Sequence, residues 1–232
     1  MDRPRPLIRC PGGWCYPFEE HQPPNSVPAR ALPAFHGAAL RSRAVIEQQI
    51  KTPSGRLILR RPVPGDLDGL FRMYSDPRLI ECDPTLAHSS IAHTQAVLER
   101  RISEWQQHGH GLWVLESSEC GSAGELVGIG GCRLLADTAW NLSFSLRPRS
   151  WGCGYAREVA AAGIEYAGAS RPGLPVTAVV AKHNTRSRRA VERAGLRKEW
   201  EGPDNHDPDP ASVMLLYADR TLSDAQVLAL TR

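Results

Sequence analysis

The segment from Trp140 to Ala169 constrains the fold of this chain more than any other, because it joins a strand, a two-glycine turn and a helix. Apolar and polar side chains alternate strictly along its first part, which reads Trp140, Asn141, Leu142, Ser143, Phe144, Ser145, Leu146. That period of two predicts a strand with one buried face. An alanine-rich run from Ala156 predicts a helix. Gly152 and Gly154 therefore lie in a strand-to-helix turn.

Two further strands, expected at 112–116 and 126–135, precede this segment and are separated by short turns that contain Gly or Asp. Such turns favour antiparallel neighbours. This order argues against a dinucleotide-binding fold, which needs parallel strands and an acid about 20 residues beyond the glycines. The turn also lacks the Gly-Lys-Ser/Thr of a Walker loop.

The remaining periodicity predicts an α+β chain in the order β-α-α-β-β-β-α-β-α-β-β. We expect a first strand from Arg56 to Pro62 and later strands at 176–181, 196–202 and 212–218. The expected helices are 64–74, 94–107, 156–169 and 187–194, and 75–90 is expected to be a loop.

The first 50 residues differ in composition from the rest. Prolines break every candidate helix or central strand between Pro4 and Pro33. We therefore expect a proline-rich arm over 1–50 that is disordered or loosely packed, extended or disordered up to Pro33, with a short helix as one option for 34–50. The folded domain is expected to span 51–232.

Composition narrows the classes of partner. A net charge of +3 with no basic stripe argues against nucleic acid as a partner. No apolar run approaches the roughly 18 residues that would span a membrane, and the N-terminus lacks an apolar signal core. The cysteines have no zinc-site spacing, so we expect no metal and reduced thiols in a cytoplasmic protein, with a Cys10–Cys15 disulfide as the alternative. They are Cys10, Cys15, Cys82, Cys120, Cys132 and Cys153.

The glycine turn has two interpretations. At a helix start the first N–H groups lack intrahelical partners, and the helix dipole adds roughly half a positive charge. Glycine lets the backbone approach a phosphate closely, so the turn can bind a pyrophosphate. The alternative is a tight turn that needs glycine only for its geometry.

Three segments carry a resemblance to a known family. In chain order they are TPSGRLILRRPVPGDLDGLFRMYSDPRL, LSFSLRPRSWGCGYAREVA and NTRSRRAVERAGL. Together they resemble the GCN5-related N-acetyltransferase (GNAT) superfamily, in its RimJ/RimL-like branch, over roughly 55–220. The resemblance implies a mostly antiparallel mixed sheet with helices on both faces, splayed between its fourth and fifth strands.

The resemblance also implies the site residues. The loop that wraps the pyrophosphate of acetyl-CoA would be Trp151, Gly152, Cys153, Gly154, Tyr155 and Ala156, and an alternative register begins at Arg149. Leu146 and Arg147 would end the strand whose backbone pairs with the pantetheine amides. Asn184 and Ser187 would contact the coenzyme arm, although each also suits the start of a helix.

The implied reaction is direct attack of a neutral amine on the thioester, without a cysteine nucleophile. Many superfamily members protonate the leaving thiolate with a tyrosine, whose position is Val191 here, so Ser187 is the expected donor. The branch usually has an acid where this chain has Asn141. Candidate bases therefore come from the loop at 75–90, with Glu81 first and Asp83 and His88 as alternatives.

The acceptor of the acetyl group is expected to be a primary amine, either a protein N-terminus or a small molecule. The loop at 203–210, which contains Asp204, Asp207 and Asp209, is either an acidic lip for a cation or a soluble turn. Two other functions stay open, namely a catalytically weak regulator that binds acyl-CoA and a nucleotide-binding module. Dimers are common in the branch, so a homodimer is one expected assembly.

Overall fold

One eight-stranded sheet runs through the described residues of the computed structural model, which are 49–119, 122–135, 137–204 and 209–231. Its strand order is β1-β2-β3-β4-β5-β6-β8-β7. Only β5 and β6 pair in parallel, and the other neighbours are antiparallel. The strands are β1 (Gln49–Lys51), β2 (Leu57–Arg60), β3 (Trp113–Ser117), β4 (Leu126–Leu135), β5 (Ala139–Leu146), β6 (Val176–Ala181), β7 (Arg197–Pro203) and β8 (Val213–Ala218).

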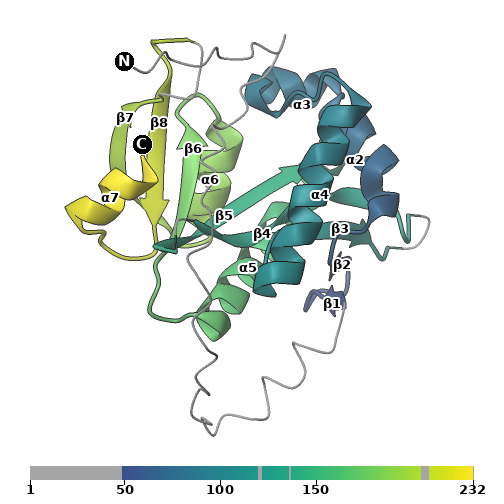
Figure 1. Cartoon of the computed structure of the whole chain (residues 1–232), viewed down its shortest axis with the longest axis horizontal. Coiled ribbons are helices and arrows are strands. Elements are labelled where there is room, and N and C mark those ends of the chain that lie inside the picture. Colours follow the sequence, from purple (N-terminus) through teal and green to yellow (C-terminus); the bar gives the residue numbers. More distant parts are fainter. Residues whose placement is uncertain (1–48, 120–121, 136, 205–208, 232) are drawn as a thin grey trace, which may run out of the picture. The chain divides into compact units, whose positions relative to one another are not determined.

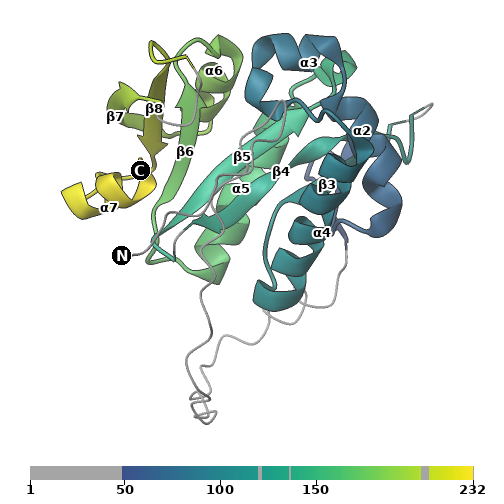
Figure 2. The same cartoon turned by 45° about the horizontal axis from the view of Figure 1, so that its top comes forward.

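Helices cover both faces of the sheet. Helix α5 packs against one face of β4 and β5, whereas α2 and α4 lie over the other face of β4 (Figure 1 and Figure 2). The helices are α2 (Leu67–Tyr74), α3 (Pro77–Cys82), α4 (Ile91–His108), α5 (Tyr155–Ser170), α6 (Thr185–Arg193) and α7 (Asp224–Leu230), with 3-10 turns η1 (Pro64–Asp66), η2 (Pro84–Leu86) and η3 (Pro148–Ser150). This is the fold class that the resemblance implied.

The alternation along β5 sets how α5 packs. Trp140 and Leu142 are buried in one cluster with Ala160 and Ala167 of α5. The small alanines let the helix lie close to the strand, and burying a large apolar side chain contributes about 1.5–3 kcal/mol. The polar residues of β5 alternate with these and lie on the opposite face of the strand.

The sheet opens between β5 and β6. These strands are in register at only two positions, Trp140 with Val176 and Asn141 with Thr177. Beyond them β5 continues to Leu146 with no registered partner on its β6 side. Because β1 precedes the expected first strand, β5 and β6 are the fourth and fifth strands of the prediction, and the predicted splay is confirmed.

Several elements were not predicted. The segment expected to be a loop at 75–90 contains α3 and η2, each started by an Asp-Pro pair. The Asp76 carboxylate accepts the Arg78 N–H at 3.0 Å, and the Asp83 carboxylate accepts the Thr85 N–H at 3.1 Å. Proline fits the first helical position, so these prolines start helical turns rather than prevent them. The others are β1, whose Gln49 and Ile50 belong to a strand rather than a helix, and α7.

Several expectations fall on residues that the structure does not describe. The N-terminal arm up to residue 48 lies outside the described residues, as do Cys10, Cys15, Cys120 and Asp207. Of the described cysteines, Cys82, Cys132 and Cys153 are free thiols. Among the helices of the described part, none is long and apolar enough to cross a membrane.

Candidate functional site

The two-glycine turn joins the open end of β5 to α5. After η3 the backbone of Gly152 has φ +81°, and that of Gly154, the N-cap of α5, has φ +85°. L-residues rarely adopt this left-handed region, so both positions favour glycine. A Cβ atom on Gly152 would meet no atom within 4 Å. The backbone, rather than crowding by the protein, therefore requires that glycine.

The amides of this turn are free to bind an anion. Within the described structure, the N–H groups of residues 152–156 have no hydrogen-bond acceptor, and α5 has no side-chain cap. Gly152, Cys153 and Gly154 are exposed. Unpaired amides at a helix N-terminus, beside the positive end of its dipole, suit a polyphosphate.

Trp151, the first residue of this turn, is held by two contacts. Its indole Nε1 donates to the carbonyl of Leu146 at 2.9 Å. The guanidinium of Arg186, in the first turn of α6, lies 4.4 Å from the centroid of its ring, within cation–π range. Arg186 Nη1 also lies 3.7 Å from the Sγ atom of Cys82 in α3. Arg186 therefore links α6 to both the turn and α3.

Leu146 ends β5 and Arg147 follows it, and both are already engaged by the protein. The Leu146 carbonyl accepts the indole N–H of Trp151, although a carbonyl can accept a second bond. The N–H of Arg147 donates to Val127 at 2.9 Å, and its carbonyl accepts the Ser150 N–H at 2.8 Å. Its side chain donates to the Gly69 carbonyl of α2 at 3.2 Å. Both backbone polar groups of Arg147 are thus paired within the protein.

Asn184 caps α6, across the opening from the turn. Its Oδ1 accepts the Ser187 N–H at 3.1 Å. The Nδ2 of Asn184 and the hydroxyl of Ser187 make no hydrogen bond with other described residues. Val191, at the position where many superfamily members have tyrosine, is 2% exposed and lies in the core.

A cleft of about 550 Å³ opens between the segment α3–η2 and the loop before β8. Its lining residues are Glu81, Pro84, Lys182, His183, Asp209, Ala211, Ser212 and Val213. Glu81 is exposed there. The structure thus brings Glu81 and Asp209, two of the acids considered from the sequence, to one cleft.

Comparison with known proteins identifies the family. The family model of the acetyltransferase (GNAT) domain matches residues 56–197. The chain belongs to the GNAT acetyltransferase family. Its members are acyltransferases, and the matched residues include β5, the glycine turn, α5 and α6.

Solved GNAT structures share the fold. A GnaT-family acetyltransferase from Bordetella pertussis is 22% identical, with a TM-score of 0.61, and the match covers 75% of this chain and 100% of that one. RimL, a ribosomal L7/L12 α-N-protein acetyltransferase in complex with coenzyme A, is 15% identical, with a TM-score of 0.59 and coverage of 72% and 94%. The microcin C7 self-immunity acetyltransferase MccE, in complex with acetyl-CoA and AMP, is 13% identical, with a TM-score of 0.59 and coverage of 74% and 98%.

The alternative bases of this GNAT domain have structural partners. The carboxylate of Asp83 caps η2. The His88 ring stacks on Tyr74, with centroids 4.2 Å apart, and its Nδ1 lies 2.9 Å from the Thr94 hydroxyl oxygen. Burial, followed by the charges of His93 and Arg100, lowers the pKa of His88 to about 4. His88 is therefore neutral at pH 7 but a weak base.

The point where the sheet opens contains an unpaired polar atom. Asn141 lies beside Thr177 in the last registered pair and is 8% exposed. Its Oδ1 atom is buried without a hydrogen-bond partner among the described residues.

The described residues contain no group of three or more His, Cys, Asp or Glu side chains that could hold a metal.

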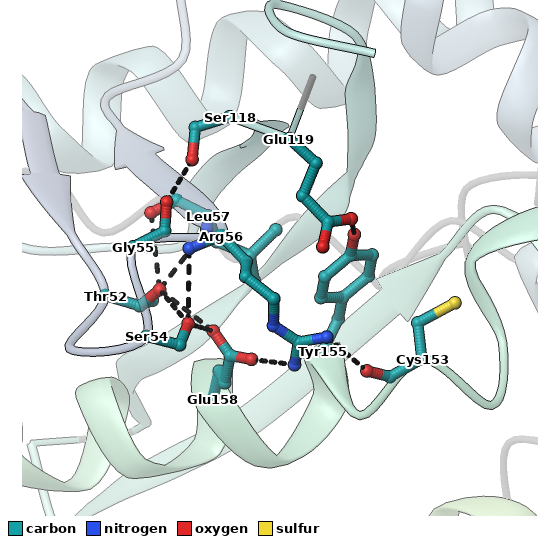
Figure 3. A network of polar contacts seen from close by, with 10 residues as sticks. All are labelled: Thr52, Ser54, Gly55, Arg56, Leu57, Ser118, Glu119, Cys153, Tyr155 and Glu158. Carbon is teal, nitrogen blue, oxygen red and sulfur yellow. Dashed lines mark hydrogen bonds and ion pairs between the residues drawn. The ribbon is translucent and has the colours of Figure 1, made fainter. Parts of the chain in front are cut away.

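The sequence reasoning missed three side chains at this GNAT site. Arg186 contacts Trp151, as described above. Arg56, from the start of β2, reaches the glycine turn and forms an ion pair with Glu158 in the first turns of α5 (Figure 3). The residues of this ion pair are 102 positions apart, so no local pattern could connect them.

Proposed function

We propose that this protein transfers the acetyl group of acetyl-CoA to a primary amine, with the coenzyme pyrophosphate bound by residues 151–156. The observation that carries this proposal is the run of unpaired amides at 152–156, between glycines in the left-handed region and beside the unpaired edge of β5. These features fit acetyl-CoA, because its pyrophosphate needs N–H donors and its pantetheine amides can pair with an open strand.

The other proposed contacts follow from the opening between β5 and β6. Leu146 would pair with the pantetheine arm through its backbone, and Arg147 would act by holding the end of the strand. From α6, Asn184 would offer its amide N–H and Ser187 its hydroxyl, since neither group is used elsewhere in the described structure. Trp151 would form one wall of the entrance.

The proposed reaction is a single transfer. The lone pair of the neutral amine forms a bond to the carbonyl carbon of the thioester, and the carbon–sulfur bond then breaks. The amine loses one proton, which Glu81 would accept directly or through water. The departing thiolate gains one proton, which Ser187 would supply and regain from solvent. No covalent enzyme intermediate is needed.

The cleft beside Glu81 supports a cationic acceptor. Glu81 and Asp209 line it, and carboxylates attract a protonated amine before it loses its proton. An α-amine, with a pKa near 8, needs less help from a base than a lysine amine, with a pKa near 10.4. A weak base system therefore favours an α-amino group. The similar RimL acts on such a group of a ribosomal protein, and another similar structure is a spermidine N-acetyltransferase.

Two alternatives need to be separated from this proposal. Val191 and Asn141, at positions where many relatives have tyrosine and an acid, motivate a regulator that binds acyl-CoA without catalysis. The anion-binding turn alone also suits a nucleotide-binding module. Membership of the GNAT family favours the acetyltransferase over both.

The test is a pair of measurements on the purified chain. Calorimetry should show binding of CoA and none of ATP at the same concentration. Release of free CoA should then be followed with acetyl-CoA and a panel of peptides with free N-termini, polyamines and amino sugars. We expect turnover with at least one amine, and about tenfold lower kcat in Ser187→Ala. CoA binding without turnover of any amine would favour the regulator, and binding of ATP alone would favour the nucleotide module.

A further inference from the structure

The turn between β1 and β2 places polar side chains beside the start of α5 (Figure 3). Thr52 Oγ1 donates to Glu158 Oε2 at 2.9 Å, and Ser54 Oγ donates to the same oxygen at 2.5 Å. The other oxygen, Glu158 Oε1, forms an ion pair with Arg56 Nη2. We name Thr52, Ser54, Arg56 and Glu158 the loop brace. It joins two parts of the chain that are more than 100 residues apart.

Arg56 extends the loop brace into the glycine turn. Its second nitrogen, Nη1, donates to the backbone carbonyl of Cys153 at 2.9 Å. Its guanidinium lies 5.0 Å from the centroid of the Tyr155 ring. The Tyr155 hydroxyl donates in turn to Glu119, so the ring is fixed at its far end. One guanidinium therefore contacts the turn, the first residue of α5 and Glu158.

The bond to the Cys153 carbonyl determines where an amide of the turn points. The described chain contains no cis peptide bond, and in a trans peptide the C=O and the following N–H point in opposite directions. When Arg56 holds the Cys153 carbonyl on its own side, the Gly154 N–H must point away from Arg56. That N–H is one of the unpaired amides at 152–156. The same bond keeps a carbonyl oxygen, which would repel a phosphate, turned toward a cation.

The ion pair also compensates a negative charge at the start of α5. Burial raises the pKa of Glu158, but the hydrogen bonds from Ser54, Arg56 and Thr52 outweigh it and hold the pKa below its ordinary value. The carboxylate is therefore ionised at neutral pH. An unpaired carboxylate so close to the turn would repel an anionic ligand. Arg56 neutralises it, and the partly buried pair is screened less by salt than an exposed one, with side-chain exposures of 36% and 14%.

We propose that Arg56, held in place by Glu158, is a positioning residue that sets the orientation of the glycine turn and thereby the affinity for the diphosphate of the coenzyme. This inference rests on the proposed binding of acetyl-CoA. Arg56 acts on the affinity rather than on the transfer step, because it contacts the turn and not the cleft that contains Glu81. The loop brace thus makes the conformation of residues 152–154 depend on the β1–β2 turn.

The test measures CoA affinity by calorimetry and steady-state kinetics in matched variants. We expect Arg56→Gln to raise the Kd for CoA and the KM for acetyl-CoA at least tenfold, with kcat and the KM for the amine within twofold of wild type. Arg56→Lys should raise the Kd about threefold, because one ammonium cannot bind the Cys153 carbonyl and Glu158 as a guanidinium does. Glu158→Gln in the Arg56→Gln background should not raise the Kd further and should lower it in part, because it removes the carboxylate that was left unpaired.

The matched control is Arg171→Gln, which removes another arginine–carboxylate pair, with Asp137, beyond the far end of α5. It should leave the Kd for CoA unchanged. If Arg56→Gln does not fold, Arg56→Lys decides the question. A Kd within twofold of wild type in the folded Arg56 variants would overturn the proposed role, and so would a kcat that falls as much as the affinity. Absence of CoA binding to the wild-type chain would instead refute the proposed function, so the two failures are distinguishable.

Discussion

The glycine turn and the cleft beside Glu81 are held by different kinds of contact. The turn is fixed by long-range contacts, through Arg56, which precedes β2, and through Trp151, which contacts Arg186 of α6. The segments that carry the acids of the cleft use local contacts, in which the Asp83 carboxylate accepts the N–H of Thr85 and the Asp209 carboxylate accepts the N–H of Ala211, each two residues away. The lining residues Lys182 and Val213 are joined over a longer range, through the Lys182 N–H and the Val213 carbonyl at 2.8 Å. Long-range bonds restrict a loop conformation more than local turns do, because they fix it relative to the core.

The two kinds of contact suit the two proposed ligands, a diphosphate at the turn and an amine acceptor in the cleft. A diphosphate presents the same oxygens in every reaction cycle, so its site gains from a rigid arrangement of amides. An acceptor site formed by helix ends and loops can change its lining without disturbing the core. We therefore expect substitutions at the turn to act on coenzyme affinity and substitutions in the cleft to act on the amine.

The largest expected effect is at the turn. A double substitution, Gly152→Val with Gly154→Val, places two β-branched residues at φ +81° and +85°. Each costs roughly 1–3 kcal/mol of strain. The turn should then relax to another conformation, and the affinity for CoA measured by calorimetry should fall at least about 30-fold. The control Gly168→Val lies in α5 in open space without a positive φ, and it should bind CoA normally. Binding within threefold of wild type in the double variant would place the pyrophosphate elsewhere.

A smaller effect is expected in the cleft. Glu81→Gln removes the proposed base and should lower kcat/KM for the amine about tenfold at pH 7, with the KM for acetyl-CoA within twofold. The deficit should shrink as the pH is raised toward 9, because an α-amine then deprotonates without help. Glu165→Gln, an exposed position on α5, is the matched control. A deficit that stays constant with pH would show that Glu81 is not the base.

The last prediction concerns no binding or turnover, only the pH dependence of the free energy of unfolding through His88. Burial keeps His88 neutral in the folded protein down to a pKa of about 4, whereas in the unfolded chain it takes up a proton near 6.5. Between these values only the unfolded chain is protonated, so stability falls as the pH is lowered from about 6.5 to 4. His88→Asn should flatten this dependence in urea unfolding measured at several pH values, and the exposed His183→Gln should not. An unchanged slope in His88→Asn would assign the loss to other groups.

The sequence predicted the parts of the molecule that rest on local patterns. The alternation of Trp140 to Leu146 predicted β5, and the two glycines predicted a turn whose backbone has positive φ at both. The resemblance added the splay, which two registered pairs confirm. The prediction of a loop at 75–90 was wrong because its Asp-Pro pairs were interpreted as breaks. Aspartate at the N-cap and proline at the first helical position instead start helical turns.

The contacts that hold the site could not be predicted in the same way. Thr52 and Glu158 are 106 positions apart, and Trp151 and Arg186 belong to different elements. Their proximity depends on the register of β1 with β2 and on the angle at which α5 crosses the sheet. Neither quantity is encoded in the local periodicity of either segment. The roles of Asn184, Ser187 and Glu81 stay predictions, because they depend on ligands.

The two registered pairs between β5 and β6 have a thermodynamic consequence. Without its coenzyme, the protein carries a sheet in which the halves are joined by few main-chain bonds, so the free chain lacks part of the stability of a continuous sheet. A ligand that pairs with β5 adds the missing bonds to the folded state alone. At 100 times its dissociation constant such a ligand raises the free energy of unfolding by about 2.7 kcal/mol. The lifetime of this protein in a cell would then follow the concentration of its own substrate.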